Sequence, residues 1–306
     1  MANLNVSSNT LSPNGSFQHS SPGNKSLPAL SPRLNLSGLA AVLSPDLKPD
    51  HDLEECDAES SDSEKPIKLK GDSDPLVEKL KASIEEGEED CLVACEALEA
   101  VAAKSCNAHR RILAAGGADV IVKAMHEYRD GDMKLQVAFC QTLQHLASAT
   151  ASMGATVVAD AGACKAIANA LSLWHSDNAL VVQAAAHALE LIAFGGPRPR
   201  EHAVKDGALE ALLGATKKHK SSAIVQQAVL AALQTLVEKN PNCQQVERVT
   251  AANGIQIIVS ILGEHKADKQ VQYWGRLLIQ NICEDHIDLK AETLRKLHYQ
   301  GIELEL

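Results

Sequence analysis

The 306-residue sequence has few aromatic residues and no long apolar run. Phe, Tyr and Trp together make up 3% of it, although apolar residues make up 45%. This composition favours many thin contacts between helices over one bulky core. No stretch approaches the ~18 apolar residues of a membrane span, and the first thirty residues lack the apolar segment of a secretory signal. We therefore expect a cytoplasmic protein without a membrane span, with entry into the nucleus left open.

Clusters of basic residues are also scarce, and the formal net charge is −10. Nucleic acids and anionic membrane surfaces reward clustered Lys and Arg, so neither is expected as the main partner. The exception is the run Lys217-Lys218-His219-Lys220. Cations at the end of a predicted helix offset its dipole, which accounts for the run without a ligand. The alternative is that the run forms a small contact site for an anionic ligand.

Sequence motifs of catalysis and metal binding are missing. The chain contains no GxxxxGK[ST], GxSxG, HExxH or GxGxxG pattern, and its eight cysteines form no CxxC pair. Cys91 and Cys95 lie one helical turn apart, but no second ligand pair matches them. Small buried helix residues are therefore favoured over half of a metal site. We predict a non-enzymatic protein with no cofactor and no metal.

What the sequence does contain is a repeat. Four segments carry a glycine just ahead of an aliphatic run, at Gly117, Gly162, Gly207 and Gly254, in steps of 45, 45 and 47 residues. Self-similarity at this period indicates stacked helical repeats. Apolar spacing predicts a short first helix, for example 108–115 or 201–205, then a second helix, for example 118–128 or 209–218, and a longer third helix after a polar loop. Each glycine is predicted to be left-handed, closing the first helix.

The third helices align on a pair of apolar residues that a small residue follows. The five copies are Leu98, Val101 and Ala102; Leu143, Leu146 and Ala147; Leu189, Ile192 and Ala193; Leu233, Leu236 and Val237; and Ile279, Ile282 and Cys283. Small side chains at the third place let neighbouring helices approach closely. We therefore expect a continuous stack.

Together these features resemble the armadillo repeat, whose third helix ends in a pattern like ALxxLA. The clearest copies are TLQHLA at 142–147 and ALELIA at 188–193. The resemblance covers about residues 75–285 and implies an all-α, right-handed α-solenoid of about four to five repeats, with the third helices lining a concave groove. The HEAT repeat is the nearest rival, but its two-helix unit lacks the extra short helix and its glycine.

The resemblance also provides a test of function. Nuclear import receptors of the importin-α type place Trp and Asn one turn apart on successive third helices. The Trp-equivalent positions here hold Glu96, Gln141, His187, Ala231 and Leu277, and the Asn-equivalent positions hold Ala100, His145, Leu191, Thr235 and Asn281. Only Asn281 matches, so the importin-α type is not expected. The row of Lys and Arg with which catenin-type proteins grip acidic ligands is missing too.

The predicted groove is instead rich in amides and acidic at its N-terminal end. It is lined by Glu96, Glu99, Gln141, Gln144, His145, His187, Glu190, Gln234, Thr235, Gln280 and Asn281. Amides can hydrogen-bond an extended backbone as donor and acceptor, so a neutral-to-basic peptide or helix of a partner protein would suit this surface. Ordinary solvated positions without a ligand remain the alternative for these residues.

We therefore predict a protein–protein interaction scaffold, with a monomer favoured. The alternative function is a regulatory subunit or chaperone-like cofactor of an enzyme, acting through its convex loops.

His145 and His187 should lie about 10 Å apart on neighbouring helices, too far for one zinc ion unless a carboxylate such as Glu190 intervenes.

Other segments carry further expectations. Residues 1–73 are Ser/Pro-rich and then acidic, which predicts a disordered tail before the solenoid at 74–285. Ser-Pro pairs at Ser12, Ser21, Ser31 and Ser44 are candidate phosphorylation sites.

Residues 195–200 are expected to form a proline-stiffened loop. Residues 286–306 should supply a C-terminal capping helix and tail, with Leu289, Leu294 and Leu297 on its apolar face. One of Tyr273 and Trp274 must face outward.

Overall fold

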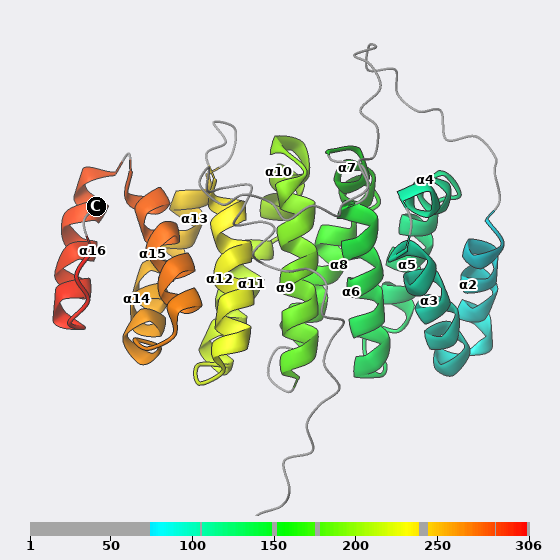
Figure 1. The fold of residues 1–306 in the computed structure, drawn as a ribbon, viewed down its shortest axis with the longest axis horizontal. Coiled ribbons are helices and arrows are strands. Elements are labelled where there is room, and N and C mark those ends of the chain that lie inside the picture. Colours follow the sequence, from blue (N-terminus) through cyan, green and yellow to red (C-terminus); the bar gives the residue numbers. More distant parts are fainter. Residues whose placement is uncertain are drawn as a thin grey trace, which may run out of the picture. The chain divides into compact units, whose positions relative to one another are not determined.

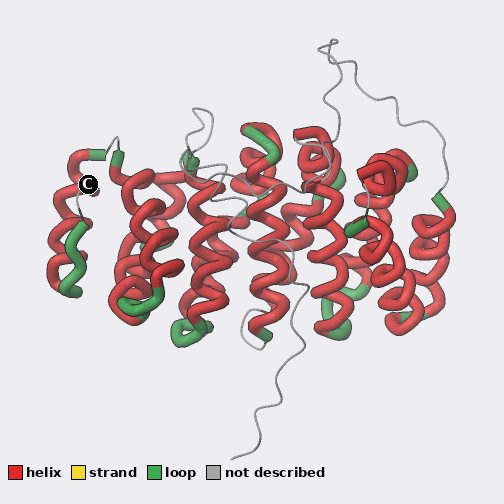
Figure 2. The backbone as a smooth tube through the Cα atoms, viewed as in Figure 1, coloured by secondary structure: helices red, strands yellow, loops and turns green. Residues whose placement is uncertain are grey.

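The computed structural model describes residues 74–104, 106–148, 152–174, 178–238, 244–284 and 286–304. Within those ranges the chain is helical and forms no strand (Figures 1 and 2). The predicted tail and its four Ser-Pro pairs lie outside the described residues. The helices are α2 (Pro75–Glu86), α3 (Glu88–Ala102), α4 (Cys106–Ala114), α5 (Gly117–Glu127), α6 (Met133–Ser148), α7 (Ser152–Asp160), α8 (Ala163–Trp174), α9 (Ala179–Phe194), α10 (Pro197–Lys205), α11 (Ala208–Lys218), α12 (Ala223–Val237), α13 (Gln245–Ala251), α14 (Gly254–Glu264), α15 (Lys269–Cys283) and α16 (Ile287–Tyr299).

The helices follow the predicted three-helix cycle. A short first helix (α4, α7, α10 and α13) leads into a second (α5, α8, α11 and α14) and a longer third (α6, α9, α12 and α15). Third helices pack side by side from α3 to α15, and the second helices form their own row beside them (Figure 1). Helices α2 and α3 supply the N-terminal partial unit. Four full repeats and one partial repeat therefore match the sequence prediction.

The core runs through the stack as one cluster of aliphatic side chains. The apolar pairs of the third helices are buried, except for the half-buried Val101. The small residues that follow them, from Ala102 to Cys283, are all buried as well. Neighbouring third helices also make the most extensive helix–helix contacts of the array, which side chains this small permit.

The left-handed residues between first and second helices differ in part from the prediction. Gly162 and Gly207 have φ of 86° and 90°, as expected, but in the outer repeats the left-handed residues are Gly116 and Asn253, with φ of 77° and 57°. These four positions are separated by 46, 45 and 46 residues, a more regular period than that of the predicted glycines. Gly117 and Gly254 lie one residue later, at the first position of α5 and α14.

Close packing explains the two glycines that are not left-handed. A Cβ on Gly254 would lie 2.4 Å from Val249 Cγ1 and 2.8 Å from the Val249 carbonyl oxygen. One on Gly117 would lie 2.5 Å from Ile112 Cγ2 and 2.9 Å from the Ile112 oxygen. Both sites need the absence of a side chain, because the end of the first helix lies directly against the start of the second.

The loop predicted at residues 195–200 is also shorter than expected. Gly195 closes α9 and Gly196, with φ of 132°, precedes α10, which already begins at Pro197. Proline is compatible with the first helical turn, since that turn leaves its amide groups without intrahelical partners. The prolines therefore start a helix here instead of stiffening a loop.

At the C-terminal end, α16 packs against α14 and α15. Leu297 is buried, and Leu289 and Leu294 are half-buried. The predicted apolar face of this helix therefore turns inward. The boundary at 285/286 stays a prediction, as does the tail that precedes the solenoid.

Substitutions at the neighbouring residues Asn253 and Gly254 should have opposite effects. Asn253→Gly removes a side chain from a left-handed position and should be neutral or stabilising by up to about 1 kcal/mol. Gly254→Ala forces a Cβ against a carbonyl oxygen and should destabilise by about 1–3 kcal/mol, although alanine favours helices. Urea unfolding followed by circular dichroism measures both. Equal stability of Gly254→Ala and wild type would contradict the packing explanation.

Candidate functional site

The eleven predicted groove residues all lie on the third helices α3, α6, α9, α12 and α15. Their side chains are exposed at Glu96 and Gln280 and buried at Glu190 and Thr235, and the other seven are half-buried. The apolar faces of these helices pack inward on the first and second helices. The polar residues therefore share the opposite face of the third-helix row, which we call the groove face.

One contact defines the register between neighbouring third helices on this face. Glu99 Oε1 of α3 lies 4.0 Å from His145 Nε2 of α6. Glu99 is the first residue after Leu98, which begins the apolar pair of α3. His145 is the second residue after Leu143, which begins the apolar pair of α6. We infer from the same offsets that Gln144 lies opposite Leu191, that Glu190 lies opposite Thr235, and that Gln234 lies opposite Asn281.

At the N-terminal junction, burial decides which protonation states are favoured. Burial raises the pKa of Glu99, and the neighbouring Glu96 carboxylate raises it further. Burial also lowers the pKa of His145. The same shift occurs in His109 of α4, whose pKa is lowered by burial and by the nearby His145. The protein therefore favours neutral imidazoles at this end of the groove face.

His109 is the more constrained of these two histidines. It is buried, and neither ring nitrogen meets a hydrogen-bond partner at good geometry among the described residues, although the Ala102 carbonyl lies near enough to oppose the pKa shift. Sequence reasoning placed His109 in a helix without assigning it a role. Helix α4 packs against α3, α5, α6 and α7, and the local pattern of α4 does not reveal these contacts.

Glu190, in the middle of the row, is the least ordinary of the groove residues. Only 4% of it is exposed, and burial raises the pKa of its carboxyl group to about 7. No hydrogen bond or ion pair reaches it from the described residues. Neither oxygen is among the fully enclosed polar atoms without a partner, so part of the small exposure that remains lies at the carboxylate. The hydroxyl of Thr235, on the facing helix, donates to Ala231 O at 3.1 Å instead.

Two side chains flank Glu190 along the same face of α9. His187 precedes it by three residues, and burial lowers the pKa of its imidazole. Phe194 follows it by four residues and is 47% exposed. Residues three or four apart on a helix are neighbours, so a buried acid and an exposed aromatic ring lie one turn apart.

Sequence reasoning missed Phe194, although a signal was present. The corresponding positions of the other third helices hold Ala103, Ser148, Glu238 and Glu284. An aromatic residue replaces small and charged ones at this one place in the row.

Charge changes sign along the row of third helices. Helix α3 contains five acidic residues and no basic one, whereas α15 contains two basic residues and no acidic one. The helices between them carry at most one charged residue each, apart from histidine. The acidic N-terminal end was predicted from the sequence, and the basic C-terminal end was not.

The C-terminal end also presents the aromatic residue that was expected there. Tyr273 is 45% exposed, whereas Trp274 is 3% exposed and lies edge-on to it, with ring centroids 4.9 Å apart. Tyr273 stands on α15 two turns before Gln280, on the groove face. The prediction that one of the two faces outward is confirmed.

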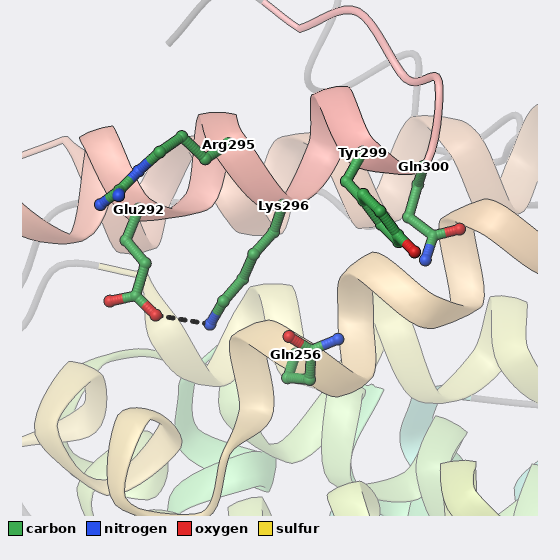
Figure 3. Close-up of a pocket in the computed structure, with 6 residues that line it drawn as sticks. All are labelled: Gln256, Glu292, Arg295, Lys296, Tyr299 and Gln300. Atoms are coloured by element: carbon green, nitrogen blue, oxygen red, sulfur yellow. Dashed lines mark ion pairs between the residues drawn. The ribbon is translucent and has the colours of Figure 1, made fainter.

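Away from the groove face, the outer surface has an open polar hollow between α14 and α16 (Figure 3). It is lined by Gln256, Glu292, Arg295, Lys296, Tyr299 and Gln300. Lys296 Nζ pairs with Glu292 Oε1 at 2.7 Å. A second hollow shares Gln256 and includes Lys217 and Lys220, from the basic run at the end of α11. The basic run therefore lies on the surface that the alternative function would use.

The cysteine pair predicted to be structural is part of the core. Cys91 and Cys95 are fully buried, and Cys95 Sγ lies 3.4 Å from Thr142 Oγ1. Burial raises the pKa of the Cys91 thiol to about 11. Across the described ranges, no three His, Cys, Asp or Glu side chains are grouped to hold a metal ion.

Comparisons with known proteins agree on the fold. No family model and no curated protein matches the sequence. A designed armadillo repeat protein in complex with the peptide (KR)4 has a TM-score of 0.60 at 18% identity, covering 74% of this chain and 88% of its own. The fold is an armadillo-type solenoid. Computationally designed armadillo repeat proteins for modular peptide recognition match equally well, with a TM-score of 0.60 at 20% identity over 74% of this chain and 87% of theirs.

The designed proteins support the armadillo interpretation, and the three-helix cycle differs from the two-helix unit of a HEAT repeat. An engineered protein with a TM-score of 0.61 at 23% identity covers 74% of this chain and 51% of its own. At such identities the likeness concerns the fold alone. Among the described helices, none has the length and apolar character needed to cross a membrane.

The buried His109 should make the solenoid sensitive to acid. Because its folded-state pKa lies below the ordinary value of 6.5, the unfolded chain binds a proton first, and stability is lost as pH falls from about 7 through the folded-state pKa. His109→Leu should therefore lose less stability between pH 7.5 and pH 5.5 than wild type does. Urea unfolding at both pH values measures this. The exposed His126→Leu serves as control and should keep the wild-type loss, whereas an unchanged loss in His109→Leu would contradict the prediction.

Glu190 should destabilise the protein at neutral pH. Its folded-state pKa of about 7 lies above the ordinary 4.5, so stability falls as pH rises between these values and the full cost applies above pH 7. Glu190→Gln should raise the unfolding free energy by up to about 3 kcal/mol at pH 8 and by much less at pH 4.5. Chemical unfolding at the two pH values, with the exposed Glu96→Gln as control, tests this. A loss of stability in Glu190→Gln at pH 8 would contradict it.

Proposed function

We propose that the protein is a non-enzymatic scaffold that holds an extended, neutral-to-basic segment of a partner protein along its groove face. The observation that carries this proposal is a row of amide and carboxyl side chains at one equivalent position of every third helix. The row consists of Glu99, Gln144, Glu190, Gln234 and Gln280.

The spacing of the row suits an extended backbone. Packed helices lie about 8–10 Å apart, and an extended chain advances about 3.3 Å per residue. Successive members of the row would therefore meet the ligand at about every third residue. Gln144 and Gln234 each offer a donor and an acceptor to peptide groups, without regard to the ligand's side chains.

Charge and fold support the basic character of the ligand. Glu96 and Glu99 lie at the acidic end of the groove face, and Glu190 lies in its middle. Of the designed armadillo repeat proteins with the same fold, one is in complex with a (KR)4 peptide and others were designed for modular peptide recognition. A similar use of this chain's groove face is consistent with its acidic end and with the amides along its length.

The second candidate function is regulation of an enzyme through the outer surface. The open hollow between α14 and α16, with Arg295 and Lys296 at its rim, is the observation that favours it (Figure 3). That hollow is confined to the last repeat and the capping helix. The amide row extends along the whole array, and for this reason we prefer the groove face.

Selection of peptides from a random 12-residue display library on the full chain tests the proposal. Enriched peptides are then titrated by fluorescence anisotropy against wild type, the double variant Gln144→Arg/Gln234→Arg and the outer-surface control Gln256→Arg. We expect the groove variant to weaken binding by about tenfold or more, because each Arg removes an acceptor and repels basic ligands. The control should stay within about twofold.

Two outcomes would overturn the groove proposal. The first is a selection that enriches no peptide. The second is binding that Gln256→Arg weakens while the groove variant leaves it intact, which would favour the outer-surface function instead.

A further inference from the structure

Glu190 is at a position where a buried carboxylate lowers the stability of the fold and an amide would lower it much less. The neighbouring helices hold Gln144 and Gln234 at the same position of the row. A glutamine has nearly the same shape and would avoid the cost of burying a charge without a partner. An acid at this position therefore lowers stability without any compensating contact in the described part of the chain.

Part of the small remaining exposure of Glu190 lies at its carboxylate. The two oxygens of Glu190 have no donor among the described residues, and neither is one of the fully enclosed polar atoms, so both keep some contact with solvent. Burial raises the pKa of this group, and no charged neighbour contributes to the shift. A cation that reaches these oxygens would gain a strong interaction, because little water surrounds them to screen it.

Phe194 supplies the second half of a cation site. Its ring is 47% exposed at the end of α9, one turn beyond Glu190. A Lys ammonium or Arg guanidinium over an aromatic face gains about 0.5–2 kcal/mol, and its aliphatic stem gains apolar contact with the ring. A side chain entering across Phe194 would place its charged end toward Glu190.

We propose that Glu190 and Phe194 form an anchor site for one Lys or Arg side chain of the bound segment. This inference rests on the proposed function and specifies which contact contributes most to binding of the partner segment. The anchor lies in the third of five third helices, with amides on either side for the backbone. Sequence preference is then concentrated at one cationic residue in the middle of the ligand.

The test compares two variants that remove one acid each from the groove face of the full chain. Labelled (KR)4 and the peptides enriched by display are titrated by anisotropy against Glu190→Gln and Glu96→Gln. General attraction predicts equal losses for the two variants. An anchor predicts a loss of about tenfold or more for Glu190→Gln, since a charge-assisted hydrogen bond is lost, and of about twofold for the exposed Glu96→Gln.

Variants of Phe194 test the other half of the site. Phe194→Ala should weaken the same peptides by about threefold to tenfold, and Phe194→Tyr should restore most of the affinity because it keeps the ring. Ile224→Ala removes another exposed apolar side chain from a third helix, and should leave binding within about twofold.

Thermal unfolding separates a lost contact from a damaged fold. Glu190→Gln should be at least as stable as wild type at pH 8, so weaker binding cannot be attributed to unfolding. Equal losses for Glu190→Gln and Glu96→Gln would overturn the anchor while leaving the scaffold function in place. The anchor also fails if display enriches peptides without a cationic residue and (KR)4 does not bind. If no peptide binds at all, the proposed function fails first.

Discussion

The close approach of neighbouring third helices is the constraint on which the rest of the structure depends. Each helix places a small residue, from Ala102 to Cys283, directly after its buried apolar pair. Side chains of this size let helices pack tightly over a long interface, so one aliphatic cluster runs through the stack. That packing holds the amide and carboxyl row in register, as the Glu99–His145 contact shows. The groove face is thus a by-product of how the core is packed.

Sequence periodicity predicted most of the helices, because the apolar spacing occurs in four full repeats and in the third helix of a partial one. It was wrong by one residue at two turns, since the letter glycine does not distinguish a left-handed residue such as Gly162 from a close approach such as Gly254. It placed Glu190 on the correct face but did not predict its burial. Helix α9 packs against helices on both sides, α6 and α12, and the local pattern of α9 does not contain these contacts.

Phe194 shows the opposite kind of omission. Its exposure could have been inferred by comparing equivalent positions, since the other copies are small or charged there. An apolar residue on a third helix is expected to pack in the core, so its apolar character alone does not indicate that Phe194 is exposed on the polar face. In a repeat protein the departure from the repeat is more informative about binding than the repeat itself, because packing requires the shared residues and leaves the others free.

The uneven charge of the first and last third helices, α3 and α15, affects the rate at which a ligand associates and the direction in which it binds. With five acidic residues on α3 and two basic residues on α15, the row of third helices carries an electric dipole along its length. A segment with a basic end and an acidic end would be turned by this field before first contact, which raises the fraction of productive encounters. Added salt would shorten the reach of the field to about 10 Å or less and slow association while leaving the short-range contacts largely intact.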